Sequence, residues 1–470
     1  MKKKSMANFF NLSLIYGFGF LFLRGISFLL LPVYTNLLSP FDAGIVFILY
    51  TILAFLNPIF AGGLDSALFK FYNSNKYSKE NVISTSIILL FFSSFSISLL
   101  LILISQTSIV QFVDVSYNWL FMLSIVLFCD SISARALVVL RLKEKAWYYL
   151  FIGLINIISS LFFNVLFIAF CQLSSAGALY ALIATSIIQF IAVLPVIISQ
   201  VQFNRVDFTL YKKMLFFGLP FVPATILFIT IGLIDRFFIE AYLGLSEVGV
   251  YSAGYKFGSL ISIIIIAFNL NWQPYYLKIQ NEKNFSTNIK KISQIFAVIL
   301  LYVAAFMCVF SSDLFQITVF GVSLIGKEFW NSSNIIPWIA FGYFFYGLYV
   351  LQAPSLYIKN KQNWTPVFWG CGTIVNILLN IVLIPKKGIS GAAIATFYSY
   401  VFMFLFIKIK NQTWMRLPLL GSILVFHACI TVCLLFLKYA NMSLVLVNVC
   451  FVLYTVATVW ILAHIKKNRL

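Results

Sequence analysis

Three basic side chains lie inside long apolar stretches of the sequence, where a charge is costly. Arg24, Arg236 and Lys256 each interrupt a run long enough to cross a bilayer as a helix. A charge at the bilayer centre costs about 2.5–3.5 kcal/mol on insertion scales, so such residues usually face a partner or a wet cavity. Arginine offers phosphate two parallel hydrogen bonds, and lysine offers it a compact charge. These residues therefore predict a cationic site for a phosphate-like anion.

A second group of charges is open to several interpretations. Asp130 and Arg135 are five residues apart in one apolar run, and Asp65 and Lys70 have the same spacing after an earlier run. Asp130 and Arg135 could be a structural ion pair or a gate at the cytoplasmic side. Asp65 and Lys70 could form a gate or an interfacial contact, or they could simply be solvated in a loop. Asp235 precedes Arg236, and both Asp130 and Asp235 are candidates for ion coupling. The simpler alternative for Arg236 and Lys256 is that their side chains snorkel to the interface.

The remaining chemistry-bearing residues do not predict an active site or a metal site. The seven cysteines all lie in apolar runs without a CxxC pair, and His427 and His464 have no acidic neighbour in the sequence. Buried structural roles are expected for all of them. No GxxxxGK[ST] motif is present, so we expect no bound nucleotide and no cofactor beyond a coupling ion, either a proton or sodium.

The composition indicates what kind of elements position these charges. Of 470 residues, 62% are hydrophobic and only 10% are charged, whereas a soluble domain carries about 25% charged residues. This predicts an all-α polytopic membrane protein. The net charge of +19 does not indicate nucleic acid, because the basic residues are spread over short loops between apolar runs.

Apolar runs bounded by polar loops predict about 14 transmembrane helices. With the N-terminus inside, the inside loops hold 24 lysine and arginine residues and the outside loops hold 4, so both termini are predicted to be cytoplasmic. The expected spans are residues 9–33, 42–62, 82–105, 117–140, 147–171, 176–200, 214–239, 248–270, 292–312, 335–358, 365–385, 389–410, 417–437 and 443–465.

Similar loop sequences recur at offsets of about 204–217 residues. LKEKAWYY (142–149) is echoed by IKNKQNW (358–364), and Gly177-Ala178 by Gly391-Ala392. Six spans per half is an even number, so the halves would be parallel repeats of the kind common in transporters. We expect an N-terminal six-helix bundle in residues 1–205, a second in 206–412, and an added helix pair in 413–470.

Several motifs together resemble those of a known family. The sequence is similar to the polysaccharide transporters, which include the O-antigen flippases, of the multidrug/oligosaccharidyl-lipid/polysaccharide flippase superfamily. The resemblance rests on the following segments: YTNLLSPFDAG (34–44), GLDSALFKFY (63–72), FGLPFVP (217–223), DRFFIEAYLGLSEVGVYSAGYKF (235–257) and NWQPYYLK (271–278).

This resemblance implies a fold and a function. The two bundles would form a V around a cavity, and the protein would move undecaprenyl-pyrophosphate-linked oligosaccharide, such as an O-antigen unit of lipopolysaccharide, to the outer leaflet of a bacterial inner membrane. The family's cavity cations match Arg24 and Lys256 by helix and depth. A polysaccharide polymerase or chain-length regulator would be a partner. Amides that could bind sugars or bridge helices are Asn57, Asn156, Asn164, Gln189, Asn376 and Asn380.

Three alternatives remain at this stage. A lipid II-type flippase would also have fourteen spans. A multidrug cation exporter of the same superfamily would need a negative cavity, whereas the charges within these spans are mostly positive. A membrane polymerase or glycosyltransferase would usually carry a long external loop, and no loop here exceeds about 25 residues. We therefore expect a transporter and not an enzyme.

Overall fold

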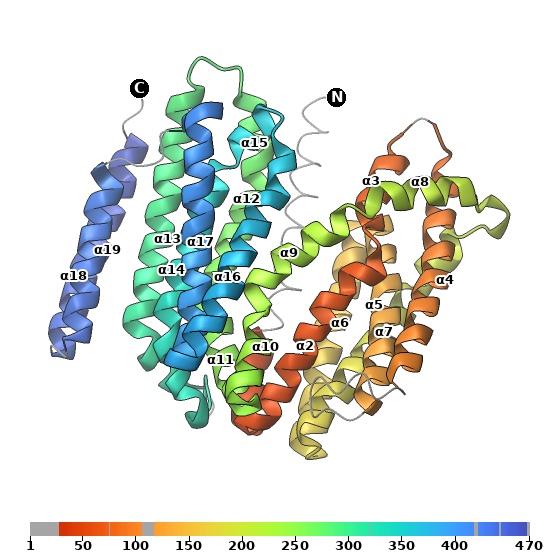
Figure 1. Cartoon of the computed structure of the whole chain (residues 1–470), viewed down its shortest axis with the longest axis horizontal. Helices are drawn as coiled ribbons and strands as arrows, with labels where there is room; N and C mark the ends of the chain where they lie inside the picture. The colour runs from red at the N-terminus through yellow and green to blue at the C-terminus, as the bar shows by residue number, and fades with distance from the viewer. Residues whose placement is uncertain are drawn as a thin grey trace. The chain divides into compact units, whose positions relative to one another are not determined.

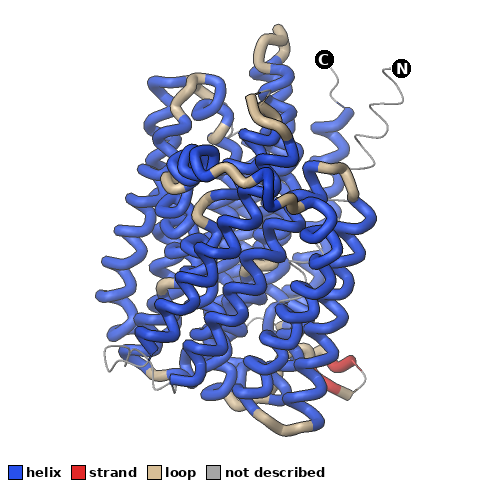
Figure 2. Tube along the Cα trace, turned by 90° about the vertical axis from the view of Figure 1, so that its right-hand side faces the viewer, coloured by secondary structure: helices blue, strands red, loops and turns tan. Residues whose placement is uncertain are grey.

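The computed structural model consists almost entirely of helices (Figures 1 and 2). It describes residues 28–74, 76–105, 117–319, 321–417, 422–440 and 443–467. In this part of the chain, eleven helices are long and apolar enough to cross a membrane, or twelve if one bent pair counts as a single span. The predicted class, a helical polytopic membrane protein, is confirmed. Most of the predicted first span lies outside the described residues.

The chain divides into two compact units, Met1–Leu233 (unit 1) and Ile234–Leu470 (unit 2). The domain boundaries expected from the sequence repeat stay a prediction. In unit 1, a described helical segment Phe28–Leu37 is followed by these elements: α2 (Pro40–Ala61), α3 (Leu64–Tyr72), α4 (Lys79–Ser105), α5 (Tyr117–Leu142), α6 (Ala146–Asn164) continuing as the π-helical turn η1 (Val165–Phe170), α7 (Ser174–Gln200), η2 (Phe203–Arg205), α8 (Phe208–Gly218) and α9 (Phe221–Leu233).

Unit 2 is also helical, with one short hairpin in which β1 (Thr318–Val319) pairs antiparallel with β2 (Val322–Ser323) (Figure 2). Its other elements are: α10 (Asp235–Leu243), α11 (Leu245–Gly258), α12 (Ile261–Ile279), α13 (Phe285–Gln316), η3 (Lys327–Ile335), α14 (Ile336–Gln352), α15 (Pro354–Ile358), η4 (Gln362–Trp364), α16 (Thr365–Lys387), α17 (Ile389–Trp414), α18 (Ser422–Tyr439) and α19 (Leu444–Lys467).

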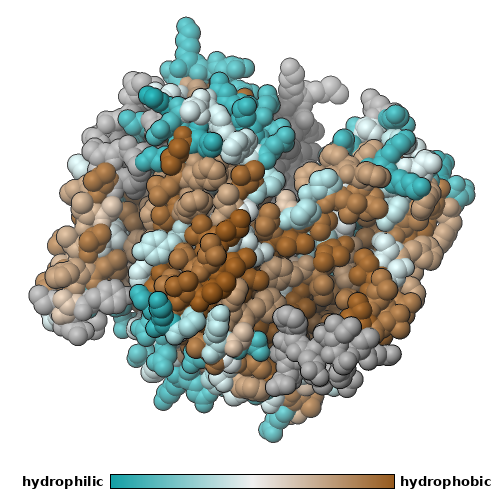
Figure 3. Space-filling view, viewed as in Figure 1, coloured by the Kyte–Doolittle hydropathy of each residue, from teal (hydrophilic) through white to brown (hydrophobic). Residues whose placement is uncertain are grey.

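The surfaces of the helices show how the spans meet lipid. α4 leaves large apolar side chains exposed along its length, among them Phe92, Phe95 and Leu99. On the face shown in Figure 3, apolar side chains cover the flanks of the helices and hydrophilic side chains gather at their ends. Apolar area of this extent is stable against hydrocarbon and not against water. The flanks are therefore membrane-facing.

α2 shows how local sequence sets helix ends. The Ser39 hydroxyl accepts a hydrogen bond from the Asp42 amide, and Pro40 occupies the first helical turn. The helix stops at Gly62, which takes the left-handed conformation at φ 56°. Serine before the first turn, proline inside it and glycine after the last turn are standard helix boundary signals. These residues begin and end α2 where the apolar run begins and ends.

A glycine contact joins α3 to α8 within unit 1. Gly63 has a φ of 64°, and a Cβ atom built on it would lie 2.0 Å from the carbonyl oxygen of Gly218. The two backbones can approach this closely only because neither residue has a side chain. The contact fixes the end of α2 and the start of α3 against the end of α8.

One turn occurs in both units with the same backbone hydrogen bonds. Glu144 and Asn360, 216 residues apart, both adopt positive φ, at 56° and 52°, and each stands between two lysines. In each turn the amide of the second lysine donates to the carbonyl five residues earlier, from Lys145 to Leu140 and from Lys361 to Leu356. This is the hydrogen bond of a Schellman helix end. The two turns thus share a backbone conformation, and the internal duplication expected from the sequence stays a prediction.

We expect Asp207→Ala to destabilise unit 1 by about 1 kcal/mol at neutral pH. Asp207 caps α8 by accepting hydrogen bonds from the hydroxyl of Thr209 and the amides of Thr209 and Leu210, and these bonds hold its pKa below the ordinary value. A depressed carboxyl pKa gives stability that is present above the ordinary pKa and lost as the pH falls through the lowered one. Thermal unfolding of the purified protein against pH, with Glu282→Ala as control, measures this. Equal unfolding of the Asp207→Ala variant and the wild type at neutral pH would contradict it.

Candidate functional site

The charged centre of unit 2 is the first turn of α10. Arg236 Nη1 lies 3.0 Å from Asp235 Oδ1, and the Tyr251 hydroxyl of α11 donates to the other oxygen of Asp235. The exposed fraction of Asp235 is 0% and that of Arg236 is 4%. The two charges are therefore a buried, hydrogen-bonded pair, and Arg236 does not snorkel to the interface.

The guanidinium of Arg236 also packs on aromatic faces. Its Cζ atom lies 4.7 Å from the ring centroid of Tyr255 and 5.7 Å from that of Tyr251. Cation–π contacts of this kind stabilise a desolvated cation by about 2 kcal/mol. Lys256, half-buried in the last turn of α11, interacts electrostatically with Arg236. Two of the three predicted cations are thus brought together in one unit.

A chain of tyrosines connects this charged centre to a cavity. The hydroxyls of Tyr255 and Tyr343 are 3.1 Å apart, and the Tyr343 ring contacts those of Tyr346 and Tyr400. Tyr346 lines a cavity of about 540 Å³ against α12, and the remaining lining residues include Asn269 and Gln273. Amide and phenol groups at the wall of a cavity suit a ligand rich in hydroxyls.

Sequence reasoning missed these cavity residues. Asn269 and Gln273 are four residues apart, so they lie on one face of α12, and Gln273 belongs to the segment NWQPYYLK. That spacing of two amides within an apolar helix was an available signal. The aromatic partners of Arg236 had no such signal, because tyrosine is common throughout the chain.

In unit 1 the predicted charges do not pair with the partners suggested by their spacing in the sequence. Arg135 Nη1 lies 2.8 Å from Asp65 Oδ1, so the arginine of α5 pairs with α3 and not with Asp130. The contact is an ion pair without hydrogen-bond geometry, since the Nη1–H does not point at the carboxylate. Arg135 is 1% exposed, whereas Asp65 is 47% exposed. Asp130 instead accepts a hydrogen bond from Ser186 of α7.

The other predicted site residues have simpler surroundings or lie outside the described residues. The Lys70 ammonium sits 3.8 Å from the ring centroid of Phe217, so it does not pair with Asp65. His427 is buried in α18, 3.2 Å from the hydroxyl of Thr458 in α19, as a structural histidine would be. Arg24 lies outside the described residues, and so does the side chain of His464.

Three of the six amides considered for sugar binding, Asn156, Asn164 and Gln189, connect helices. Asn156 donates to Gln189 between α6 and α7, and Tyr34 donates to Asn164 at 2.9 Å. Asn380 donates to Asn376 at 2.9 Å within α16, and both are fully buried. For Asn156, Asn164 and Gln189 these contacts favour helix bridging. Over the described ranges, no three His, Cys, Asp or Glu side chains are grouped as a metal site would require.

The fold of this chain is similar to that of solved membrane transporters. A lipid II flippase, MurJ, in an inward closed conformation has a similar structure, with a TM-score of 0.73 and 16% identity over 96% of this chain and 98% of that one. An inward-facing multidrug resistance MATE transporter of the MOP superfamily has a TM-score of 0.65 and 13% identity over 83% of this chain and 95% of that one. At this identity the similarity shows the fold.

The family is shown by sequence. Residues 6–280 match the family described as "Polysaccharide biosynthesis protein", which covers more than half of the chain, so the chain belongs to this family. A Shigella flexneri protein whose name assigns it provisionally to O-antigen transport is 24% identical over 186 residues, which are 39% of this chain and 43% of that protein. The resemblance drawn from the motifs is thereby confirmed.

Proposed function

We propose that this protein is a flippase for undecaprenyl-pyrophosphate-linked oligosaccharide, an O-antigen or similar surface-polysaccharide unit, working by alternating access. Membership in the polysaccharide biosynthesis family supports the class of substrate. The observation that carries the proposal is Arg236, a buried cation held on Asp235 with Lys256 nearby. A pyrophosphate carries two or more negative charges, and a desolvated arginine binds it with charge-assisted hydrogen bonds.

The two parts of such a substrate match two features of unit 2. The pyrophosphate would bind Arg236 and Lys256, with Arg24 as a further cation. Sugar hydroxyls would bind the cavity lined by Asn269 and Gln273, where Tyr346 offers a ring face and a hydroxyl. The polyprenyl chain would stay in lipid against the exposed apolar flanks. This is transport without bond chemistry, so no catalytic group is required.

Coupling, location and partners complete the proposal. A proton or sodium gradient would drive transport, with Asp130 and Asp235 as the carboxylates within spans. Asp65, Arg135 and Lys70 would form a gate at one end of unit 1, where Asp65 and Arg135 are already paired. The protein would reside in a bacterial inner membrane with both termini cytoplasmic and would supply a polysaccharide polymerase or chain-length regulator.

One observation favours a second candidate, a lipid II-type flippase. The structural match to MurJ extends over 96% of this chain. Lipid II also carries a pyrophosphate on a polyprenyl chain, so the cationic site would serve either substrate. The two candidates differ in the glycan and are separated by which mutant strain the protein rescues. A multidrug cation exporter is disfavoured by the positive charge of Arg236 and Lys256.

We expect the wild-type protein to restore surface polymer in a strain that lacks its own flippase and holds the matching glycan pathway. Arg24→Ala and Lys256→Ala should abolish this at equal membrane abundance, because each removes a cation from the proposed pyrophosphate site. Arg24→Lys should keep partial export if charge matters more than bidentate geometry. Lys387→Ala, in the exposed last turn of α16, is the control.

Normal export by both alanine variants would refute the proposed cationic site. The fold assignment would be unaffected. Rescue of a strain without a lipid II flippase, with no rescue of the surface-polysaccharide strain, would replace the proposed substrate with lipid II.

A further inference from the structure

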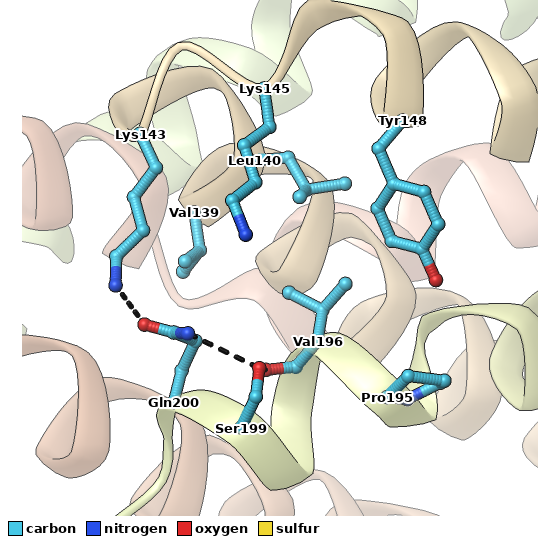
Figure 4. A pocket seen from close by; sticks show the side chains of 9 residues that line it. All are labelled: Val139, Leu140, Lys143, Lys145, Tyr148, Pro195, Val196, Ser199 and Gln200. Atoms are coloured by element: carbon cyan, nitrogen blue, oxygen red, sulfur yellow. Dashed lines mark hydrogen bonds between the residues drawn. The ribbon is translucent and has the colours of Figure 1, made fainter.

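A second basic site lies in unit 1, at the end of α5 and far along the sequence from Arg236. A pocket of about 320 Å³ opens there between the turn joining α5 to α6 and the last turns of α7 (Figure 4). Its residues fall into an apolar group and a polar group: Val139, Leu140, Val196 and Pro195 against Lys143, Lys145, Tyr148, Ser199 and Gln200. A pocket that is apolar on one side and cationic on the other suits an amphiphile with a negative headgroup.

The turn that carries the two lysines is held in a fixed shape. Glu144 between them is in the left-handed region, and the Lys145 amide donates to the Leu140 carbonyl at 2.9 Å. Figure 4 shows both lysine side chains descending from this turn toward α7. Lys143 donates to the side-chain oxygen of Gln200, whose nitrogen donates to the Ser199 hydroxyl at 3.1 Å. The backbone of the turn thus places both lysines at the pocket, and the contact with Gln200 fixes the ammonium of Lys143.

The charged residues that line this pocket, Lys143 and Lys145, are both basic. The positive charges of Lys145 and Lys79 repel the Lys143 ammonium, and the negative charge of Glu80 attracts it. Partial burial, followed by the repulsion of Lys145, lowers the pKa of Lys143. Like charges held together in this way are relieved by a bound anion.

The position of the pocket along the helices indicates where such an anion comes from. It lies where the spans Trp119–Leu142 and Ala146–Phe170 meet, which is the level of lipid headgroups. Trp147, 76% exposed, stands beside the turn, and Ile198 of α7 is 74% exposed. Exposed tryptophan and isoleucine at this level face lipid, so an acyl chain can continue along the protein from a headgroup in the pocket.

We infer that this pocket binds the phosphate of an anionic phospholipid from the surrounding leaflet. The phosphodiester would accept hydrogen bonds from Lys143 and Lys145, the polar headgroup would reach Ser199 and Gln200, and the first acyl carbons would lie on Val139 and Val196. The lipid would hold the α5–α6 turn against the end of α7. This site shares no residue with the proposed transport site.

The test is lipid retention by the full-length protein. Wild type purified in detergent is titrated with phosphatidylglycerol and with phosphatidylcholine, and bound lipid is counted by native mass spectrometry. Lys143→Ala/Lys145→Ala should weaken phosphatidylglycerol retention by about tenfold or more, given the contribution of each lysine near an anionic lipid. Lys143→Arg/Lys145→Arg should retain it. Lys359→Ala/Lys361→Ala, which changes the same turn in unit 2, is the matched control for lost charge.

The outcomes separate the sources of phosphate. Selective retention of phosphatidylglycerol that is lost only in the Lys143/Lys145 alanine variant supports the inference. Equal loss in the Lys359/Lys361 variant would overturn it, because the effect would then be net charge alone. Displacement of the lipid by glycerol phosphate or inorganic phosphate would assign the pocket to a free anion. Displacement by undecaprenyl pyrophosphate would assign it to the transported lipid. Failure of the flippase proposal would leave the lipid result unchanged.

Discussion

Replacing Asp235 with alanine is expected to lower the free energy of unfolding of this protein by about 3–5 kcal/mol and to abolish export. Asp235 is fully buried, and its two oxygens hold Arg236 and the Tyr251 hydroxyl. Removing one partner of a buried ion pair leaves the other charge without compensation, and this is the large cost. Thermal unfolding in detergent and surface-polymer export at matched abundance measure the two effects.

The double variant Asp235→Ala/Arg236→Ala distinguishes structure from transport. It removes both charges, so we expect it to regain much of the stability lost in Asp235→Ala. If Arg236 binds the pyrophosphate, export stays absent although the protein is folded. Restored export in the double variant would show that the pair is only structural. Asp313→Ala, at an exposed acidic residue of α13, controls for the loss of a carboxylate.

The second large effect is expected for Gly63→Ala. The new Cβ atom would lie 2.0 Å from the Gly218 carbonyl oxygen, and the residue would be held at a φ of 64°. Because the obstacle is backbone, relief requires α3 and α8 to separate. Strain and overpacking together should cost more than about 3 kcal/mol. We expect a sharp fall in the amount of folded protein that enters the membrane, measured by fluorescence-detected size exclusion.

Gly62→Ala is the matched control for this prediction. Gly62 has nearly the same φ, 56°, but its nearest neighbours are side-chain atoms of Leu215 and Leu64 at 3.7 Å or more. We expect Gly62→Ala to lower the free energy of unfolding only by the strain of a left-handed alanine, about 1–2 kcal/mol. If the two variants were equally unstable, the close approach of the backbones would not be what limits this position.

The helices could be predicted from the sequence because long apolar runs mark segments that lie in lipid, whereas polar runs mark loops in water. The span expected at 82–105 is α4 (Lys79–Ser105), and the span expected at 389–410 is α17 (Ile389–Trp414). Breaks within spans were harder to see. Gly218 and Pro220, at the interruption between α8 and α9, are helix-breaking residues. Ser259 and Leu260, which follow Gly258 where α11 gives way to α12, have no helix-breaking chemistry of their own.

The sequence predicted which charged residues belong to the site, but it did not predict which residues they contact. The cost of burial identified Arg236 and Lys256 from their positions in apolar runs. It could not identify Tyr255, whose contact with Arg236 depends on how α10 packs on α11. The same limit applies to Arg135, whose partner Asp65 is 70 residues earlier and on another helix. Sequence spacing suggests neighbours within one helix, whereas buried charges find partners by tertiary packing.

The 45° bend between α11 and α12 affects the electrostatics of its span. α11 ends at Gly258, so the carbonyls of its last turn place the negative end of a helix dipole beside Lys256. α12 begins at Ile261, so its first amides place a positive end a few residues away. An unbroken helix would have neither end in the middle of the span. The bend thus supplies backbone partial charges of both signs within the hydrocarbon layer, in a chain that has only 13 acidic residues to balance 32 basic ones.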